Sequence, residues 1–303
     1  MKKIMFLATL CLFALSCSNE TIESELNEVM NSEKATAPVT VRVNGFSITQ
    51  EDFPTGGTRA EQDVADYSGV KAIDIAFYSG ETEVYKTTQV RGQGGYSTFG
   101  EFSCNLPIGS YTMVVVGRGW FDGDVFTLTS PTVAAYTSDH VRETFVASQA
   151  VNITSANAVN LSATLERIVA QVTVISTDGK SAEAKKVRTT FAASGKGLNP
   201  STGLATTNTG FSNTVGVSTA VGVVSSSVNF AFLYSNEQTM SVTVDVLNEA
   251  GNVICTHTIN NVPLKRNRKT TLRGPIYTAT AVASSAFQLE TDWLDGDGNT
   301  VYF

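Results

Sequence analysis

The first regular alternation of apolar and polar side chains in this chain reads Val39-Thr40-Val41-Arg42-Val43-Asn44-Gly45-Phe46-Ser47-Ile48. The alternation is unbroken to Val43, shifts its phase at Asn44-Gly45 and resumes at Phe46. A period of two residues is typical of a strand with one buried face, and one inserted residue makes a β-bulge. The segment therefore predicts a bulged strand, whose apolar face comprises Val39, Val41, Val43, Phe46 and Ile48.

The same alternation returns at short intervals through the rest of the chain. Turn formers separate several of the runs, and no stretch beyond residue 38 has the spacing of a long helix. Short strands divided by turns are typical of a β-sandwich, and a phase change at Glu166-Arg167 favours two sandwiches joined near residues 155–167. We expect an all-β fold with further strands at 73–77, 111–116, 159–165, 168–174, 228–234, 242–246 and 253–259.

The composition fits a large all-β protein and disfavours several other classes. The 303 residues suffice for one large β domain or two ordinary ones; 42% are hydrophobic and only 16% are charged. These fractions exclude a coiled coil, a disordered chain and collagen. The formal net charge is −7 and no basic cluster is present, so we expect no binding of nucleic acid.

Residues that carry chemistry are sparse in this sequence. Its two histidines, His140 and His257, have no Ser-His-Asp or Cys-His arrangement around them. Its four cysteines show no CxxC spacing, and two histidines cannot complete a conventional zinc site. We therefore expect no enzymatic activity, no bound metal and no cofactor.

The start of the chain is organised like an export signal. Lys2 and Lys3 precede an apolar run, Ile4–Leu15, that is too short to span a bilayer but suits a signal-peptide core. The run ends at Ser16-Cys17, and a small residue before a cysteine resembles the lipobox of lipoprotein precursors. We predict that residues 1–16 are removed and that Cys17 carries lipid such as palmitate, which holds the chain to a membrane. The alternative is an ordinary signal peptide that leaves a free thiol.

The segment after Cys17 is polar and acidic, and we expect residues 17–38 to form a flexible tether. Cys11 lies inside the signal, so the folded part keeps Cys104 and Cys255. Each stands in an apolar alternating stretch and is either a buried thiol or half of a disulfide. The sequence leaves this alternative open.

Three short segments follow one another along the alternating strands. The first joins Phe102 to Leu106-Pro107-Ile108-Gly109-Ser110-Tyr111; the second is Leu165-Glu166-Arg167-Ile168-Val169-Ala170-Gln171-Val172; the third is residues 262–274, with Pro263-Leu264-Lys265-Arg266-Asn267 at its start. Each segment alone is common in β proteins. In this order, behind a lipobox, they resemble the fimbrillin superfamily, the lipoprotein precursors of type V pili and their anchors. The resemblance covers most of residues 39–303.

The resemblance implies a domain plan for the chain. Family members carry two tandem transthyretin-like, Greek-key β-sandwich domains after a lipoprotein signal peptide. The corresponding domains here would be residues 39–160 and 161–303, with residues 39–59 as a removable propeptide strand.

The resemblance also implies processing and strand exchange. Many members are cut by a trypsin-like, arginine-specific protease, which removes the first strand and opens a groove for a strand of the next subunit. The matching bond is Arg59-Ala60, which we place in a glycine-containing loop where a protease can act; otherwise Arg59 is an ordinary loop residue. Val301, Tyr302 and Phe303 are the candidate donor strand, whereas we expect residues 287–293 to fold back into the second domain.

The sequence thus predicts a structural subunit of a fimbria, exposed on the cell outer membrane and serving adhesion. Its partners would be copies of itself or other pilus subunits, with the membrane reached through the lipid on Cys17. One alternative is a fimbrial anchor or tip lipoprotein that does not polymerise. Another is a surface lipoprotein that binds glycans, in which Trp120 and Phe121 stack on a sugar instead of plugging a turn.

Overall fold

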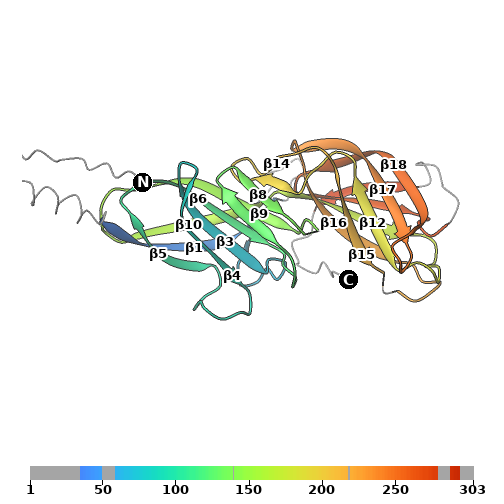
Figure 1. The fold of residues 1–303 in the computed structure, drawn as a ribbon, viewed down its shortest axis with the longest axis horizontal. Helices are drawn as coiled ribbons and strands as arrows, with labels where there is room; N and C mark the ends of the chain where they lie inside the picture. The colour runs from blue at the N-terminus through green and yellow to red at the C-terminus, as the bar shows by residue number, and fades with distance from the viewer. Residues whose placement is uncertain (1–34, 50–58, 139, 218, 279–286, 294–303) are drawn as a thin grey trace, which may run out of the picture. The chain divides into compact units, whose positions relative to one another are not determined.

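The structure is a computed structural model and describes residues 35–49, 59–138, 140–217, 219–278 and 287–293 (Figure 1). Within these residues the chain forms twenty strands and no helix, so the predicted all-β fold is confirmed. Accordingly, none of the described segments is a helix with the length and apolar character needed to cross a membrane.

An eight-stranded sheet contains most of the first half of the chain. Seven strands follow the order β2-β1-β10-β9-β6-β3-β4, and β5 pairs with β1 outside this path. β1 and β10 run parallel to each other, and the other pairs are antiparallel. The strands are β1 (Thr36–Thr49), β2 (Arg59–Asp63), β3 (Ala72–Ser79), β4 (Thr82–Val90), β5 (Glu101–Pro107), β6 (Gly109–Arg118), β9 (Thr144–Ile153) and β10 (Val159–Arg167).

Three four-stranded sheets contain the remaining strands. Their orders are β16-β11-β19-β20, β15-β12-β17-β18 and β14-β13-β8-β7. The strands are β7 (Phe126–Ser130), β8 (Val133–Tyr136), β11 (Val169–Ser176), β12 (Lys186–Phe191), β13 (Gly197–Asn199), β14 (Leu204–Ala205), β15 (Phe211–Gly216), β16 (Ser226–Phe232), β17 (Glu237–Leu247), β18 (Val253–Lys265), β19 (Arg268–Gly274) and β20 (Gln288–Trp293).

Buried apolar side chains gather in three clusters. The first joins the inward faces of β1, β3, β6, β9 and β10. The second lies between the β11–β19 pair and the sheet formed by β12, β17 and β18. The third joins the other face of β3 and β6 to β8, β13 and β16. Strands that bury both faces explain why β3 reads as a nearly continuous apolar run.

The strands expected from alternation are present at the expected places, from β3 over 73–77 to β18 over 253–259. β10 runs without a break from Val159 to Arg167 and pairs with β1 and β9. It therefore crosses the point between residues 160 and 161 at which the sequence divides the two domains. That division and the tandem transthyretin-like architecture stay predictions.

Candidate strand-exchange site

β1 has neighbouring strands on both of its sides. On one side it pairs in parallel with β10, from Val39 opposite Val159 to Ser47 opposite Glu166. On the other side it pairs antiparallel with β5 over Thr36–Arg42 and with β2 over Gly45–Thr49 (Figure 1). Withdrawal of β1 would leave a slot with unpaired backbone groups along both walls, which is the geometry that accepts an added strand.

The predicted bulge in β1 is confirmed. The register with β10 shifts between Val43 and Gly45, so Asn44 has no partner of its own in that ladder. Because of this extra residue, the apolar side chain that follows Asn44-Gly45 points to the core again. As a result Phe46 reaches the same buried cluster as Val43.

Four side chains on the apolar face of β1 belong to the first cluster. Val39, Val41, Val43 and Phe46 are each at most 4% exposed. Burial of an aliphatic or aromatic side chain contributes about 1.5–3 kcal/mol, so these four together contribute roughly 6–12 kcal/mol before ordering costs. The side chain of Ile48 lies outside the described residues. The slot of β1 thus consists of four apolar pockets at fixed spacing.

Phe46 packs against two other aromatic rings. Its ring lies 4.9 Å from that of Phe145 and 5.5 Å from that of Tyr67, and the latter two rings are themselves 5.5 Å apart. Tilted and edge-on aromatic contacts at such distances stabilise beyond the area that they bury. A strand that replaces β1 would need a large side chain at this position.

A buried polar cluster lies directly behind this aromatic trio. The Arg167 guanidinium forms an ion pair with Glu143 at 2.9 Å, and both side chains are almost completely buried. The Tyr67 hydroxyl donates to Glu143 Oε1 at 2.6 Å and accepts from Arg167 at 3.0 Å. Burial and the neighbouring Glu143 carboxylate raise the pKa of Tyr67 far above its usual value. Gly69 packs against this cluster. A larger residue would collide with it, because a Cβ at this position would lie 2.7 Å from Glu143 Oε2.

This cluster links segments that are distant in the sequence. Arg167 also donates to Asn267 Oδ1 at 3.2 Å, and Asn267 lies in the tight turn between β18 and β19 with a left-handed φ of 60°. Two of the three segments that resemble the fimbrillin motifs therefore meet at one point. The sequence pattern gave no indication of this meeting, because Tyr67 and Asn267 each lie 100 residues from Arg167.

The Arg59-Ala60 bond lies elsewhere than expected. The sequence placed Arg59 in a loop, and this prediction was wrong: Arg59 and Ala60 begin β2, where they pair with Thr49 and Ile48. β2 is the terminal strand of its sheet path. A protease needs an extended, unpaired segment, so the bond becomes available only when this end of β2 separates from β1.

The C-terminal part of the chain divides into two. β20 pairs antiparallel with β19, from Arg268 opposite Trp293 to Arg273 opposite Gln288, so the expected return of residues 287–293 is confirmed. Val301, Tyr302 and Phe303 lie outside the described residues, as does Cys17. Their assigned roles as donor strand and lipid attachment point stay predictions.

The two thiols of the folded part are free and do not form a disulfide with each other. Cys104 lies on β5 directly opposite Val39 of β1, and burial raises its pKa to about 11. Cys255 lies in the second cluster and its thiol contacts the carbonyl oxygen of Ile276 at 3.0 Å. Because Cys104 is half-buried beside β1, its reactivity would respond to the removal of that strand.

Potential ligands for metal are dispersed over the described part of the chain, in which no three His, Cys, Asp or Glu side chains gather. His257 is buried and its Nε2 lies 3.1 Å from the carbonyl oxygen of Ile276, which places it as a strand residue of the core. His140 Nε2 lies 2.8 Å from the carbonyl oxygen of Thr214.

Comparison with known proteins gives a family and several similar structures. The model of a family of unknown function (DUF6562) matches residues 35–297. No curated protein matches the chain. A candidate adhesin from Bacteroides ovatus is 12% identical over 86% of this chain and 97% of that chain, with a TM-score of 0.49. The fimbrial anchor protein Mfa2 from Porphyromonas gingivalis is 14% identical over 86% of this chain and 98% of that chain, with a TM-score of 0.46.

Proposed function

Because this chain belongs to DUF6562, a family of unknown function, we propose a function from its own geometry and motifs. We propose that it is a non-catalytic structural subunit of a surface fimbria, exported as a lipoprotein to the outer membrane through Cys17. An arginine-specific protease would cut it after Arg59, and strand exchange would then join it to copies of itself or to other fimbrial subunits, in the service of adhesion.

One observation supports this proposal above all others. β1 is the first strand of the described residues, it is paired on both sides, and it contributes four apolar side chains to the first cluster. A single cut after Arg59 separates β1 from all the later described strands, so β1 can leave without drawing any of them through the sheet. A strand with the same neighbours in the middle of the chain could not be released by a single cut.

The covalent link between β1 and β2 decides when exchange can occur. While the link is intact, β1 is held beside its slot at a high effective concentration, and a competing strand from another molecule is disfavoured. After a cut at Arg59 the released segment becomes a separate peptide and is diluted away. A donor strand with similar apolar spacing would then bury comparable area, so polymerisation needs neither a cofactor nor an energy source.

An Arg59→Lys variant tests the proposal with the charge preserved. The wild-type chain and the variant are incubated with an arginine-specific protease, mass spectrometry identifies the new N-terminus, and electron microscopy with size-exclusion chromatography detects filaments. We expect a wild-type chain that begins at Ala60 and forms filaments, and a variant that remains monomeric. Filaments from the uncut variant, or a cut wild-type chain that has lost β1 and stays monomeric, would contradict the proposal.

The same mass measurement on material taken from the cell surface separates the related alternatives. A chain that begins at Ala60 supports the polymerising subunit. A chain that begins at lipidated Cys17 and retains β1 would identify an anchor instead, because its slot would stay filled.

A further inference from the structure

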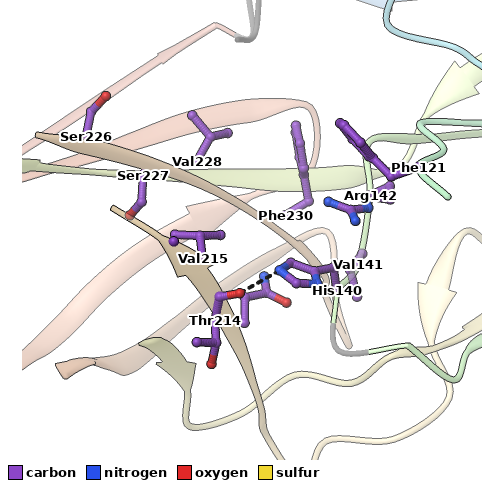
Figure 2. A pocket seen from close by; sticks show the side chains of 12 residues that line it. Phe121, His140, Val141, Arg142, Thr214, Val215, Ser226, Ser227, Val228 and Phe230 are labelled. Atoms are coloured by element: carbon purple, nitrogen blue, oxygen red, sulfur yellow. Dashed lines mark hydrogen bonds between the residues drawn. The ribbon is translucent and has the colours of Figure 1, made fainter. Parts of the chain in front are cut away.

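A cavity of about 310 Å³ lies beside β15 and β16. Its walls come from β15 and β16, which are the end strands of two different sheets, and from Phe121 and residues 140–142 (Figure 2). The volume is at the small end of the range of ligand pockets, roughly 300–1,000 Å³, and suits one or two rings of a small molecule.

Polar side chains with unmet hydrogen-bonding capacity line this cavity. Asn213 is 1% exposed and Ser227 is 9% exposed, and neither Asn213 Oδ1 nor Ser227 Oγ has a hydrogen-bond partner within the described part of the chain. Thr189, which pairs with Asn213 across the ladder but does not line the cavity, has an unpartnered hydroxyl as well. Buried polar groups without partners are rare in native proteins, so several at one place call for hydrogen-bonding groups supplied from outside.

The mouth of the cavity carries an aromatic ring that is held in a fixed orientation. Phe121 is 39% exposed, and the Arg142 guanidinium lies 4.5 Å from the centre of its ring. Asp124 fixes both partners: its carboxylate accepts two hydrogen bonds from Arg142 at 2.7 and 2.8 Å and one from the Phe121 N–H at 3.0 Å. The ring is therefore positioned before any ligand arrives, which lowers the entropy that binding would lose.

The charges around the cavity are already balanced. Arg142 is neutralised by Asp124, and the other ionisable lining residue, His140, hydrogen-bonds through Nε2 to the carbonyl oxygen of Thr214 (Figure 2). The backbone carbonyl can only accept, so Nε2 carries the proton in this bond. An anionic or cationic ligand would have no counter-charge left to meet.

We propose that this cavity binds one neutral sugar residue, a binding function separate from strand exchange. The apolar C–H face of the sugar ring packs on Phe121, and its hydroxyl groups exchange hydrogen bonds with Asn213 and Ser227. A sugar matches the site because it offers an apolar face and many O–H groups without charge. The sequence had suggested Trp120 or Phe121 for such stacking, and Trp120 is not among the residues that line this cavity.

Saturation-transfer-difference NMR on the full chain tests the proposal. The probes are glucose, galactose, mannose, N-acetylglucosamine, N-acetylgalactosamine and fucose, with sialic acid as the charged comparison. We expect at least one neutral sugar to bind, and Phe121→Ala and Asn213→Ala each to weaken it about tenfold or more, as expected when a stacking or hydrogen-bonding partner is removed. The neighbouring Trp120→Ala variant is the matched control and should change the affinity less than about twofold.

Three results would overturn the proposal. The first is that no neutral sugar binds, in which case water alone satisfies the buried groups. The second is binding that Phe121→Ala and Asn213→Ala leave unchanged. The third is binding of sialic acid alone. The melting temperature shows whether Asn213→Ala folds. If it does not, Ser227→Ala, which removes only one hydroxyl group, takes the place of Asn213→Ala in the binding comparison.

Discussion

β1 and β20 are the first and last described strands of the chain, yet they are held in opposite ways. β1 has a strand on each side, and Val39, Val41, Val43 and Phe46 on its apolar face are buried. β20 pairs with β19 alone at the end of its sheet, and its Leu289 is 40% exposed. A strand whose loss opens a core must be replaced, whereas a strand held along one edge can leave at small cost. Under the proposed strand exchange, β1 is therefore the strand whose departure would leave an acceptor slot.

Truncation should show the largest difference between the two ends. A chain of residues 60–300 lacks both β1 and the candidate donor strand. It forfeits the roughly 6–12 kcal/mol that the four apolar side chains of β1 contribute, so we expect it to unfold or aggregate. A chain that ends at Phe287 lacks β20 and should remain folded. Urea denaturation followed by circular dichroism measures both. Equal stability of the two truncated chains would contradict the claim that β1 contributes far more to the stability of the fold than β20 does.

Single substitutions sharpen the same contrast. Phe46→Ala should lower the free energy of unfolding by about 3–5 kcal/mol, because it empties the pocket between Tyr67 and Phe145. Leu289→Ala, its counterpart on β20, should lower it by less than about 1 kcal/mol, because the side chain is already partly in water. Chemical denaturation of both variants checks this, and similar losses would show that Phe46 is not a special anchor.

The buried ion pair behind Phe46 should matter almost as much. Glu143→Ala leaves the Arg167 charge buried without its carboxylate, and such losses cost about 3–5 kcal/mol. Glu237→Gln removes the partner of Lys265 from an exposed pair and is the control, for which we expect little change in the denaturation midpoint. If Glu143→Ala changed the denaturation midpoint as little as the control does, the buried polar cluster would not contribute to the stability of the fold.

The reactivity of Cys104 should report whether β1 is present. Burial raises the pKa of this thiol to about 11, so little of it is thiolate at pH 8 while β1 is in place, and the thiolate fraction should rise after the strand leaves. Because only the thiolate reacts, iodoacetamide should label Cys104 faster after release, by about tenfold for each unit by which its pKa falls. The difference in labelling rate between the chain without β1 and the chain with β1 should become smaller as the pH rises toward 11, because the thiol then ionises in both. Cys255, in the other cluster, is the internal control and should label at an unchanged rate.

The parts of the fold that follow from local periodicity could be predicted from sequence. The alternation of residues 39–48 gave both β1 and its bulge, because side-chain direction in a strand depends only on neighbouring residues. Arg59 was misplaced because Arg59-Ala60-Glu61-Gln62-Asp63 has no apolar alternation, and only its partner β1 makes it a strand. The contacts of Arg167 with Tyr67 and Asn267, and the choice of Phe121 over Trp120 at the cavity, depend on tertiary packing that no local pattern records.

Replacement of β1 by another strand is tested most directly with a synthetic peptide of residues 36–49. The chain is cut after Arg59, the released segment is removed, and a fluorescent form of the peptide is added; a peptide with Val41→Asp on the buried face is the control. We expect the cut chain to take up one native peptide, to exclude the control peptide and to stop forming filaments once the slot is filled. A cut chain that never releases β1, or that forms filaments equally well with the slot occupied, would contradict strand exchange.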